Sequence, residues 1–338
     1  MKVLVAGGAG YIGAHVVRAL AAHGHTPIIL DDLRASSIDR CHPFTLEAVP
    51  LEDTSRVLEV FQKHEPEAVV HLGGYISVGE SMREPTRYWE NNLGSGISLL
   101  LACARFPVHT FLFSSTAAVY GTTTESPIDE NSPLVPTSPY GASKLAFERA
   151  LHRSAAALGI RSLALRYFNA SGANVEWGVG EAHDPEEHLI PRVIRSLLDG
   201  NLVQVYGDDY PTPDGTCVRD YVHVSDLAEA HVLALESAEL ETGQSFNVGT
   251  GCGYSVLEVI QEIAKQLSLN PNIQFLPRRP GDPPRLVANA SSLMSCLQWH
   301  PTHSSLEEIV GSAIAWEMSA VNKGSSQPSP ALNTSGGR

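Results

Sequence analysis

The chain has 338 residues, of which 43% are hydrophobic and 18% charged, and its 23 basic and 37 acidic side chains give a formal net charge of −14. A chain of this length and hydrophobic content can bury one large core or two joined cores, so we expect two domains. The acidic balance argues against a partner such as nucleic acid or an anionic membrane. An anionic ligand would therefore need a local cationic pocket.

Neither the cysteines nor the apolar segments indicate an exported or membrane protein. The five cysteines are scattered and never form C-x-x-C, so neither a disulfide framework nor a zinc site is expected. The chain has no apolar signal region at its start and no run of about 18 apolar residues. We therefore expect a cytoplasmic protein.

Short apolar runs alternate with amphipathic stretches in the first half of the chain. Strands are expected at residues 3–6, 28–30, 68–71, 111–113 and 163–165, and helices at 12–23, 54–64, 88–105 and 143–158. In the helical stretches apolar residues recur every three or four positions. This alternation predicts an α/β fold, with a Rossmann-type doubly wound parallel sheet that carries helices on both faces.

Glycine and proline become frequent after residue 171, which predicts a smaller, loop-rich second domain. Residues 220–236 and 245–248 are expected to form a helix and a strand that return to the first domain. The predicted division is therefore residues 1–170 plus about 220–250 for the Rossmann domain, and 171–219 plus 251–320 for an α/β substrate domain. Residues 321–338, rich in Ser, Pro and Gly, are expected to be a disordered tail.

A glycine-rich turn, Gly7-Gly8-Ala9-Gly10-Tyr11-Ile12-Gly13, joins the first predicted strand to the first predicted helix. Such glycines let a pyrophosphate approach the backbone at a helix N-terminus. The next strand ends at Asp31, 18 residues after Gly13, where a carboxylate can bind ribose hydroxyls and would repel a 2′-phosphate. The pattern predicts NAD rather than NADP as the cofactor; a glycine turn with a local capping Asp is the alternative.

The sequence Tyr140-Gly141-Ala142-Ser143-Lys144 opens a predicted helix, and its four-residue spacing places the Tyr hydroxyl and the Lys ammonium on one face. A free Tyr has a pKa of about 10, so an adjacent ammonium and a cationic nicotinamide would be needed to make it a general base. Taken alone, this spacing is more often an exposed helix turn. A buried strand ending in Ser114-Ser115-Thr116 supports the catalytic interpretation, because ligands bind at the carboxyl ends of such strands.

Together these motifs resemble the extended short-chain dehydrogenase/reductase family, and further blocks narrow the resemblance to the UDP-glucose/UDP-galactose 4-epimerases. These blocks include Asn91-Asn92, Arg166-Tyr167-Phe168-Asn169, His188-Leu189-Ile190-Pro191, Cys217-Val218-Arg219-Asp220 and Arg278-Arg279-Pro280-Gly281-Asp282. The resemblance covers residues 1 to about 318. It implies that the sugar is oxidised transiently at C4 and that the hydride returns to the opposite face, which interconverts UDP-glucose and UDP-galactose.

The resemblance also implies roles for individual residues. The implied catalytic residues are Tyr140, Lys144 and Thr116. The implied NAD-binding residues are Gly7, Gly10, Tyr11, Ile12, Gly13, Asp31, Asn91, Ser114, Tyr140, Lys144 and Phe168. The implied UDP-sugar-binding residues are Thr116, Asn169, His188, Leu189, Gln204, Tyr206, Arg219, Arg279, Asp282 and Leu286. Arginine suits a diphosphate because its planar fork donates paired hydrogen bonds. A homodimer is expected, as in similar proteins.

Several alternatives stay open. Similar dehydratases place Asp-Glu directly after the active-site Thr, where this chain has Ala117-Ala118, so elimination of water is disfavoured. A 4-epimerase of another UDP-sugar, such as UDP-N-acetylglucosamine, a pentose or a uronic acid, and a non-catalytic NAD-binding regulator are the other hypotheses. Ile76 stands where many members have Lys, which implies looser NAD retention.

The stretch from His183 to His188 combines histidines and carboxylates. Its spacing is not that of the helical H-E-x-x-H motif and a proline interrupts it, so no metal is expected.

Overall fold

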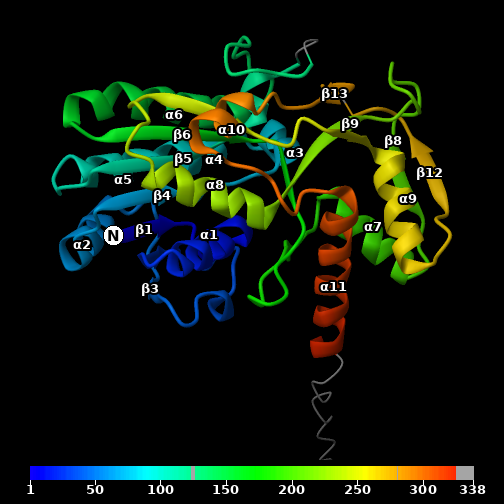
Figure 1. Ribbon diagram of the computed structural model, residues 1–338, viewed down its shortest axis with the longest axis horizontal. Helices are drawn as coiled ribbons and strands as arrows, with labels where there is room; N and C mark the ends of the chain where they lie inside the picture. The colour runs from blue at the N-terminus through cyan, green and yellow to red at the C-terminus, as the bar shows by residue number, and fades with distance from the viewer. Residues whose placement is uncertain (123–125, 280, 325–338) are drawn as a thin grey trace, which may run out of the picture.

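A seven-stranded parallel sheet forms the frame of the larger part of the molecule, to the left in Figure 1. The computed structural model describes residues 1–122, 126–279 and 281–324. The strand order is β10-β6-β5-β4-β1-β2-β3. The strands are β1 (Lys2–Ala6), β2 (Thr26–Leu30), β3 (Thr45–Glu47), β4 (Ala68–His71), β5 (Thr110–Thr116), β6 (Arg161–Tyr167) and β10 (Gln244–Val248). Most of their residues are buried, as expected where helices cover both faces.

Helices cover the two faces of this sheet and form two hydrophobic cores. One face carries α1 (Tyr11–Ala22), α8 (Val224–Glu236) and α10 (Ser291–Leu297). The other carries α2 (Thr54–His64), α5 (Gly94–Cys103) and α6 (Pro139–Leu158). Shorter elements in this part are η1 (Ile38–Arg40), α3 (Val78–Arg83), α4 (Pro85–Tyr88), the π-helical turn η2 (Trp89–Leu93) and η3 (Ala117–Tyr120). The predicted doubly wound Rossmann-type fold is confirmed.

The strand order reverses between β1 and its neighbour β4, which is where ligands bind in folds of this kind. The turn after β1 lies directly against the turn after β4. A Cβ on Gly7, whose φ is +80°, would lie 2.5 Å from the backbone nitrogen of Gly73. Only glycine satisfies both the backbone angle and this close approach.

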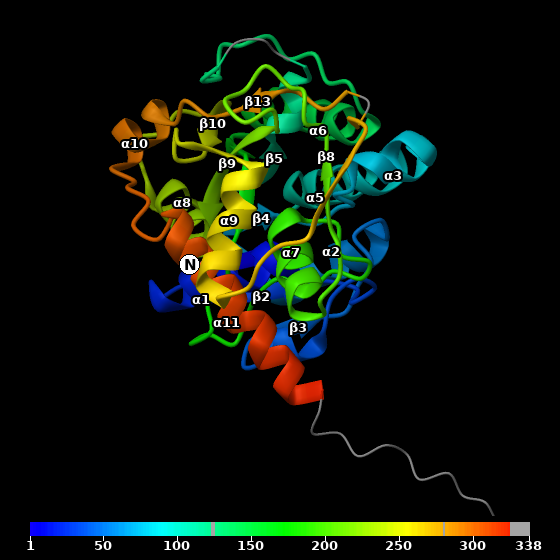
Figure 2. The ribbon, with the colours of Figure 1, turned by 90° about the vertical axis from the view of Figure 1, so that its right-hand side faces the viewer.

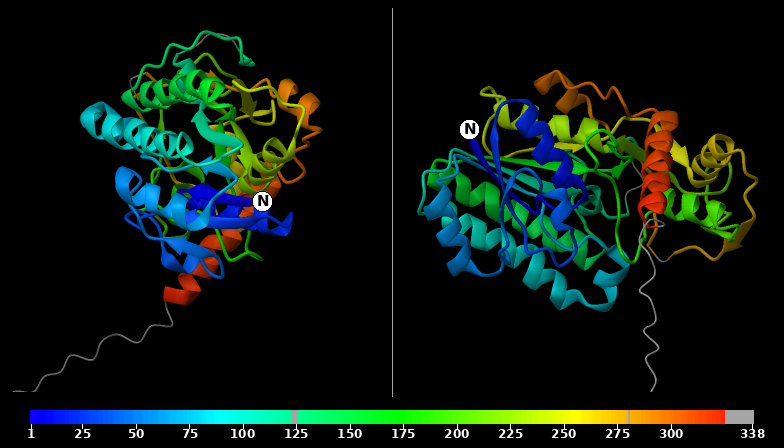
Figure 3. Two further views of the ribbon diagram at one scale, coloured as in Figure 1. Left: turned by 90° about the vertical axis from the view of Figure 1, so that its left-hand side faces the viewer. Right: turned by 90° about the horizontal axis from the view of Figure 1, so that it is seen from below.

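The smaller part of the molecule lies to the right in Figure 1 and faces the viewer in Figure 2. Its mixed sheet consists of β7 (Asn169–Ser171), β9 (Val218–His223), β11 (Gly253–Ser255) and β13 (Arg285–Leu286), and β8 (Val203–Tyr206) pairs with β12 (Ile273–Leu276). A third hydrophobic core joins α7 (Leu189–Leu198), α9 (Val256–Leu267) and α11 (Leu306–Gly324). The right panel of Figure 3 shows α11, in red, between the large sheet and α7.

Four expectations differ from the structure. The helix expected from residue 220 begins at Val224, because residues 218–223 form β9, which pairs with β7, β11 and β13. The helix expected at 88–105 is divided into the end of α4, η2 and α5. Residues 291–299, expected in the second domain, pack into the core of the first. Residues 321–324 continue α11, whereas the rest of the expected tail, 325–338, lies outside the described residues. Among the helices of the described ranges, none is long and apolar enough to cross a membrane.

Candidate active site

The glycine turn opens α1 without a side-chain cap, since its N-cap residue is Gly10. The first N–H groups of a helix have no partner inside it, so those of Tyr11, Ile12 and Gly13 can donate to an anion. The Tyr11 side chain points elsewhere: it is buried and its hydroxyl donates to the Gly172 carbonyl at 2.6 Å. A Cβ on Gly13 would lie 2.1 Å from the carbonyl oxygen of Gly7, so a larger residue would open the turn.

Asp31 follows β2 and lies beside the glycine turn. Its Oδ2 accepts a hydrogen bond from the Ala9 amide at 3.1 Å, and its Oδ1 accepts from the Leu33 amide at 2.9 Å and from Ser36 Oγ at 2.8 Å. A carboxylate is thus held next to a set of free amide donors. This arrangement fits the ribose and pyrophosphate of a dinucleotide.

Lys144 is 3% exposed and lies under the end of β5. Its Nζ donates to the Ser114 carbonyl at 3.1 Å and lies 5.1 Å from the centre of the Phe113 ring. Burial lowers the pKa of Lys144 to about 8. The ammonium is also close to the turn after β4, since a Cβ on Gly74 would lie 3.6 Å from Nζ.

Tyr140 lies one turn before Lys144 on α6, which begins at Pro139 with Ser138 as its N-cap. Burial raises the pKa of the Tyr140 hydroxyl, and a hydrogen bond with Thr116 lowers it in part. Thr116 itself is 8% exposed at the end of β5. The fold thus brings Thr116, Tyr140 and Lys144 together, and Tyr140 needs a further positive charge before it can act as a base near neutral pH.

Asn92 joins three segments around this group, although only its neighbour Asn91 was predicted as a site residue. Its Oδ1 accepts from the Tyr75 amide at 2.8 Å, and its Nδ2 donates to the Tyr75 carbonyl at 3.1 Å and to Ser143 Oγ at 3.2 Å. Asn91 Oδ1 accepts from the same Tyr75 amide at 3.2 Å, and its Nδ2 donates to Glu52 at 3.3 Å. Both asparagines lie in η2, and π-helical turns are frequent at functional sites.

Two of the remaining predicted cofactor residues lie at strand ends near this group. Ser114 contributes its carbonyl to Lys144, and Phe168 follows β6 with its amide donating to the Val248 carbonyl at 3.1 Å. Ile76, where many similar proteins carry Lys, is 44% exposed and adds no charge here.

A cavity of about 400 Å³ lies in the smaller part of the molecule and collects residues from widely separated segments. Eight of the ten predicted substrate residues line it: Asn169, His188, Leu189, Gln204, Tyr206, Arg219, Arg279 and Asp282. Arg192, which the sequence analysis did not single out, lines it as well; it lies three residues after Leu189 on α7, and this spacing could have indicated it.

Two predicted substrate residues, Thr116 and Leu286, do not line this cavity. Thr116 is beside Tyr140, and Leu286 on β13 packs against a hydrophobic cluster that includes Phe168 and Ala288.

Cations give this cavity the local positive charge that an acidic chain needs to bind an anion. Arg219 Nη1 donates to the carbonyl of the preceding residue, Val218, at 2.8 Å, and the guanidinium forms an ion pair with Asp282. The Arg279 guanidinium lies 4.1 Å from the centre of the Tyr206 ring. Such guanidinium groups match phosphate oxygens, and an aromatic face next to them suits a planar base.

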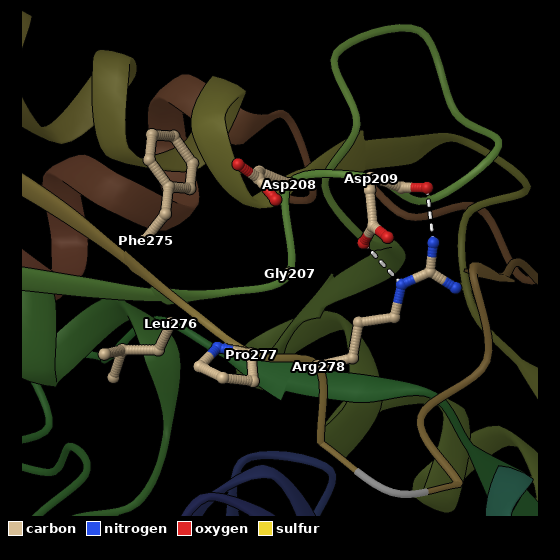
Figure 4. Close-up of a pocket in the computed structure, with 7 residues that line it drawn as sticks. All are labelled: Gly207, Asp208, Asp209, Phe275, Leu276, Pro277 and Arg278. Carbon is tan, nitrogen blue, oxygen red and sulfur yellow. Dashed lines mark hydrogen bonds and ion pairs between the residues drawn. The ribbon is translucent and has the colours of Figure 1, made fainter.

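A second hollow of about 350 Å³ lies nearby, between the loop after β8 and the end of β12 (Figure 4). Its lining includes a single arginine, Arg278, whose Nε donates to Asp209 Oδ1 at 2.6 Å and whose guanidinium lies 4.2 Å from the centre of the Tyr210 ring. The lining of the larger cavity includes Arg192 and Arg279 besides the paired Arg219. None of the seven residues that line the second hollow was a predicted site residue. The larger cavity is therefore the candidate substrate site.

Comparison with known proteins shows the family of the chain. Residues 3–249 match the NAD dependent epimerase/dehydratase family. The UDP-glucose 4-epimerase of Azospirillum brasilense is 44% identical over 325 residues, which are 94% of this chain and 92% of that protein. The enzyme of the same name from Halalkalibacterium halodurans is 42% identical over 320 residues, 94% of this chain and 95% of that protein.

A solved structure of UDP-glucose 4-epimerase from Brucella ovis in complex with NAD superposes with a TM-score of 0.89 at 41% identity, covering 93% of this chain and 97% of that one. The fold and the resemblance expected from the sequence are therefore confirmed. The family match covers more than half of the chain, and the similarity extends through the smaller part as well. The chain belongs to the NAD-dependent epimerase/dehydratase family.

Proposed function

We propose that this protein interconverts UDP-glucose and UDP-galactose by NAD-dependent epimerisation at C4 of the sugar. The observation that carries this proposal is the adjacency of the Thr116–Tyr140–Lys144 group to the arginine-containing cavity. Tyr167 ends β6 beside Ser114 and Tyr140, and Asn169, two residues later, lines the cavity. Two extended residues span about 7 Å, and this short separation supports placing the sugar end of a ligand in the cavity next to Tyr140.

In the proposed reaction Tyr140 takes the proton of the sugar 4-hydroxyl while the hydride leaves C4. When bound, NAD supplies the two-electron acceptor that takes up and returns this hydride. Thr116 lies close enough to lower the pKa of the Tyr140 hydroxyl, and its own hydroxyl would share the proton. Lys144 lies one helical turn after Tyr140 on α6, and its positive charge would favour the Tyr140 phenolate. When the hydride returns to the opposite face of C4, Tyr140 returns the proton to the oxygen, and no atom is gained or lost.

The residues after Thr116 explain why the 4-keto sugar is not dehydrated. Ala117 and Ala118 carry no acid or base, and they form η3 at the end of β5. Elimination of water would need a group that protonates the leaving hydroxyl and one that removes a proton from the neighbouring carbon. Reduction back to an alcohol is then the remaining route.

For the nucleotide, we propose that Arg219 and Arg279 hold the diphosphate and that Tyr206 and Gln204 contact the uracil. Asn169, His188 and Leu189 would contact the sugar side. A solved UDP-glucose 4-epimerase from Bifidobacterium longum in complex with NAD+ and UDP has a TM-score of 0.89 and 36% identity, covering 95% of this chain and 99% of that one, which supports a UDP-sugar as ligand.

We further propose a cytoplasmic homodimer. Exposed apolar side chains on η2 and α5 support a contact between copies: Trp89, Ile97 and Leu101 are 39%, 37% and 46% exposed. Isolated exposed apolar residues are normal, but several of them on adjoining helical segments support an interface.

The predicted domain division is proposed with changed boundaries. Residues 1–168, 224–250 and 291–299 would form the NAD-binding domain, since β10 joins the large sheet and α10 packs on its core. Residues 169–223, which include β7 and β9 of the smaller sheet, would form the UDP-sugar domain with the rest of 251–320 around the third core.

A broader substrate range is the second candidate function. A UDP-Glc/GlcNAc 4-epimerase from Campylobacter jejuni has a TM-score of 0.80 and 36% identity to this chain. The family resemblance implies that the position of Leu286 is a bulky aromatic in members restricted to glucose and galactose and small in members that admit N-acetylhexosamines, and leucine is intermediate in volume. We therefore expect slow turnover of UDP-N-acetylglucosamine, and no product at saturating substrate would contradict this expectation.

The experiment is to incubate the purified protein with UDP-galactose, without added NAD, and to follow UDP-glucose by NMR. Tyr140→Phe should lower the rate by about 100- to 10,000-fold, the usual contribution of a general base. Its bound NAD, measured after release, should be unchanged. Tyr254→Phe removes a tyrosine hydroxyl on β11, outside the reacting group, and should keep full activity. A 4-keto-6-deoxy product, or no conversion even with NAD supplied, would overturn the proposal.

A further inference from the structure

Two imidazoles and two carboxylates converge in the loop between β7 and α7. One ligand atom from each of Glu181, His183, Glu186 and His188 lies within 4.8 Å of all the others. We refer to these four residues as the 181–188 cluster. Nothing in the proposed epimerisation uses Glu181, His183 or Glu186.

The hydrogen bonds inside the cluster do not satisfy its atoms. Glu181 is 7% exposed, and its Oε1 lies 2.6 Å from Nδ1 of His188 and 3.2 Å from Nδ1 of His183. His188 Nδ1 can carry only one proton, and it is already hydrogen-bonded to Glu186 Oε1 at 2.9 Å. Within the described ranges, Glu181 Oε1, His183 Nδ1 and Glu186 Oε2 are buried atoms without a hydrogen-bond partner. Buried carboxylate oxygens that converge with imidazole nitrogens in this way call for a cation, which is either a protonated imidazole or a metal ion.

Among the described lysine and arginine side chains, only Arg195 contacts the carboxylates of the cluster, and it already forms an ion pair with Glu317. Its Nη2 lies 3.9 Å from Glu186 Oε2, while its Nε and Nη2 donate to the two oxygens of Glu317 at 2.9 and 2.8 Å. Arg195 therefore does not neutralise Glu181. Burial by itself would lower the pKa of His188, but its contacts with Glu181 and Glu186 raise it to about 10, so without an ion its imidazolium balances one carboxylate. When both imidazoles bind a metal they are neutral, and the cluster then carries two negative charges, which match a divalent ion.

The donor set selects the metal. Two imidazole nitrogens and two carboxylate oxygens suit Zn²⁺, whereas Ca²⁺ and Mg²⁺ prefer six or more oxygen ligands. Zinc bonds of about 2.0 to 2.2 Å place the ligand atoms of a tetrahedron roughly 3.3 to 3.6 Å apart. The short separations of 2.6 and 2.9 Å at His188 Nδ1 would therefore widen by about 1 Å or less as an ion enters.

We propose that the 181–188 cluster is a structural Zn²⁺ site with four protein ligands. Four protein ligands leave no open position for substrate, which is typical of structural rather than catalytic zinc. The site shares His188 with the proposed UDP-sugar cavity, but Zn²⁺ binding does not require the epimerase reaction.

The surroundings show what such an ion would hold in place. The Glu181 carbonyl accepts from Trp316 Nε1 of α11 at 2.6 Å, and the preceding carbonyl, of Gly180, accepts from Arg40 of η1 at 3.0 Å. His183 lies next to Tyr11 of the glycine turn, with ring centres 6.3 Å apart. His188 is the N-cap residue of α7. An ion here would connect the start of α7, which forms one wall of the cavity, to the segment around His183, which lies beside the glycine turn.

The test uses the full-length protein after removal of metals by dialysis against a chelator. Co²⁺ is then titrated, because tetrahedral Co²⁺ absorbs strongly in the visible range, and Zn²⁺ is used to displace it. One Co²⁺ per chain with a tetrahedral spectrum that Zn²⁺ abolishes is the expected result. No uptake, or only the weak spectrum of six-coordinate Co²⁺, would overturn the proposal and leave the cluster as a set of His–Glu ion pairs. Epimerase activity is not measured, so failure here is separate from failure of the proposed function.

Variants locate the ion. Glu181→Gln and His183→Asn each remove one ligand, and each should weaken Zn²⁺ binding by at least about 100-fold, above the 10- to 100-fold loss typical of outer-shell changes. The matched control is His23→Asn, since His23 pairs with Glu229 at 3.2 Å and with Glu236 at 3.6 Å in an exposed His–Glu set. It should leave the affinity unchanged. Equal affinity in all three variants would overturn the assignment, and the titration of the unmodified protein decides the proposal if a variant fails to fold.

Discussion

Glu148 and Arg166 form an ion pair in the interior of the Rossmann-type part, with side chains 3% and 5% exposed. Glu148 Oε2 accepts from Ser115 Oγ at 2.6 Å, and its Oε1 accepts from Arg166 Nη2 at 2.5 Å and from Ser245 Oγ at 3.1 Å. Burial by itself would raise the pKa of Glu148, but the hydrogen bonds and charge of Arg166 outweigh it and lower the pKa. Glu148 lies one turn after Lys144, so its carboxylate ties this part of α6 to β5, β6 and β10.

Glu148→Gln should destabilise the protein strongly because it leaves the Arg166 charge buried without its counter-ion. Removing one partner of a buried pair costs about 3 to 5 kcal/mol. At about 2.1 cal/mol/K per residue, the unfolding entropy of 338 residues is roughly 0.7 kcal/mol/K. The expected drop in Tm is therefore about 4 to 7 °C.

The assay is thermal unfolding followed by circular dichroism at a fixed, saturating NAD concentration. The matched control is Lys265→Gln, which breaks a surface pair in which the Lys265 side chain is 71% exposed and its Nζ lies 3.1 Å from Glu262. Exposed helix pairs contribute about 0.5 kcal/mol or less, so the control should change Tm by less than about 1 °C. A drop for Glu148→Gln no larger than that of the control would refute the reasoning.

Three further changes test other parts of the structure. Gly13→Ala should weaken NAD binding by about 10- to 100-fold, because overpacking costs about 1 to 3 kcal/mol and the new Cβ would lie 2.1 Å from the Gly7 carbonyl; calorimetric titration showing unchanged affinity would contradict this. Burial lowers the pKa of His71 to about 3 in the folded protein, whereas the pKa of a histidine in the unfolded chain is about 6.5. Below pH 6.5 the unfolded chain therefore binds a proton that the folded protein excludes, and at pH 5 this lowers the free energy of unfolding by about 2 kcal/mol. In urea unfolding at pH 7 and pH 5, His71→Leu should remove that part of the loss, and an unaltered pH dependence would argue against a neutral buried imidazole. Arg219→Met should raise the KM for UDP-galactose at least about tenfold, with less effect on kcat, since a charged hydrogen bond contributes about 1.5 to 3 kcal/mol; an unchanged KM would exclude a role in diphosphate binding.

The parts of the site that depend on local chain geometry could be predicted from the sequence. The glycine turn needs a strand before it and a helix after it, and both are visible in the apolar spacing around Gly7 and Gly13. The four-residue spacing of Tyr140 and Lys144 puts them on one helix face wherever that helix lies. Asp31 and Thr116 end buried strands, and in a parallel sheet all such ends meet at one edge.

Other predicted residues depended on the resemblance to a family, because local patterns do not indicate them. Asn169, Gln204, Arg219 and Asp282 belong to four separate segments, and the cavity exists only where the folded chain brings these segments together. No periodic signal connects residues so far apart in sequence. The cavity and its arginines could therefore not be predicted from composition and residue spacing alone.

Tertiary contacts also decided features against the local pattern. Residues 218–223 form a strand because they pair with β7, which precedes them in the chain, and with β11 and β13, which follow them. The residues after position 223 favour a helix, so local sequence did not predict this strand. The 181–188 cluster shows the same effect: with a proline and irregular spacing it matches no helical metal motif, yet the folded loop turns Glu181, His183, Glu186 and His188 toward one point. Local periodicity is enough to predict the sheet, the glycine turn and the Tyr–Lys pair. The cavity, β9 and the 181–188 cluster depend on contacts between segments far apart in the chain, and these contacts form only when the chain has folded.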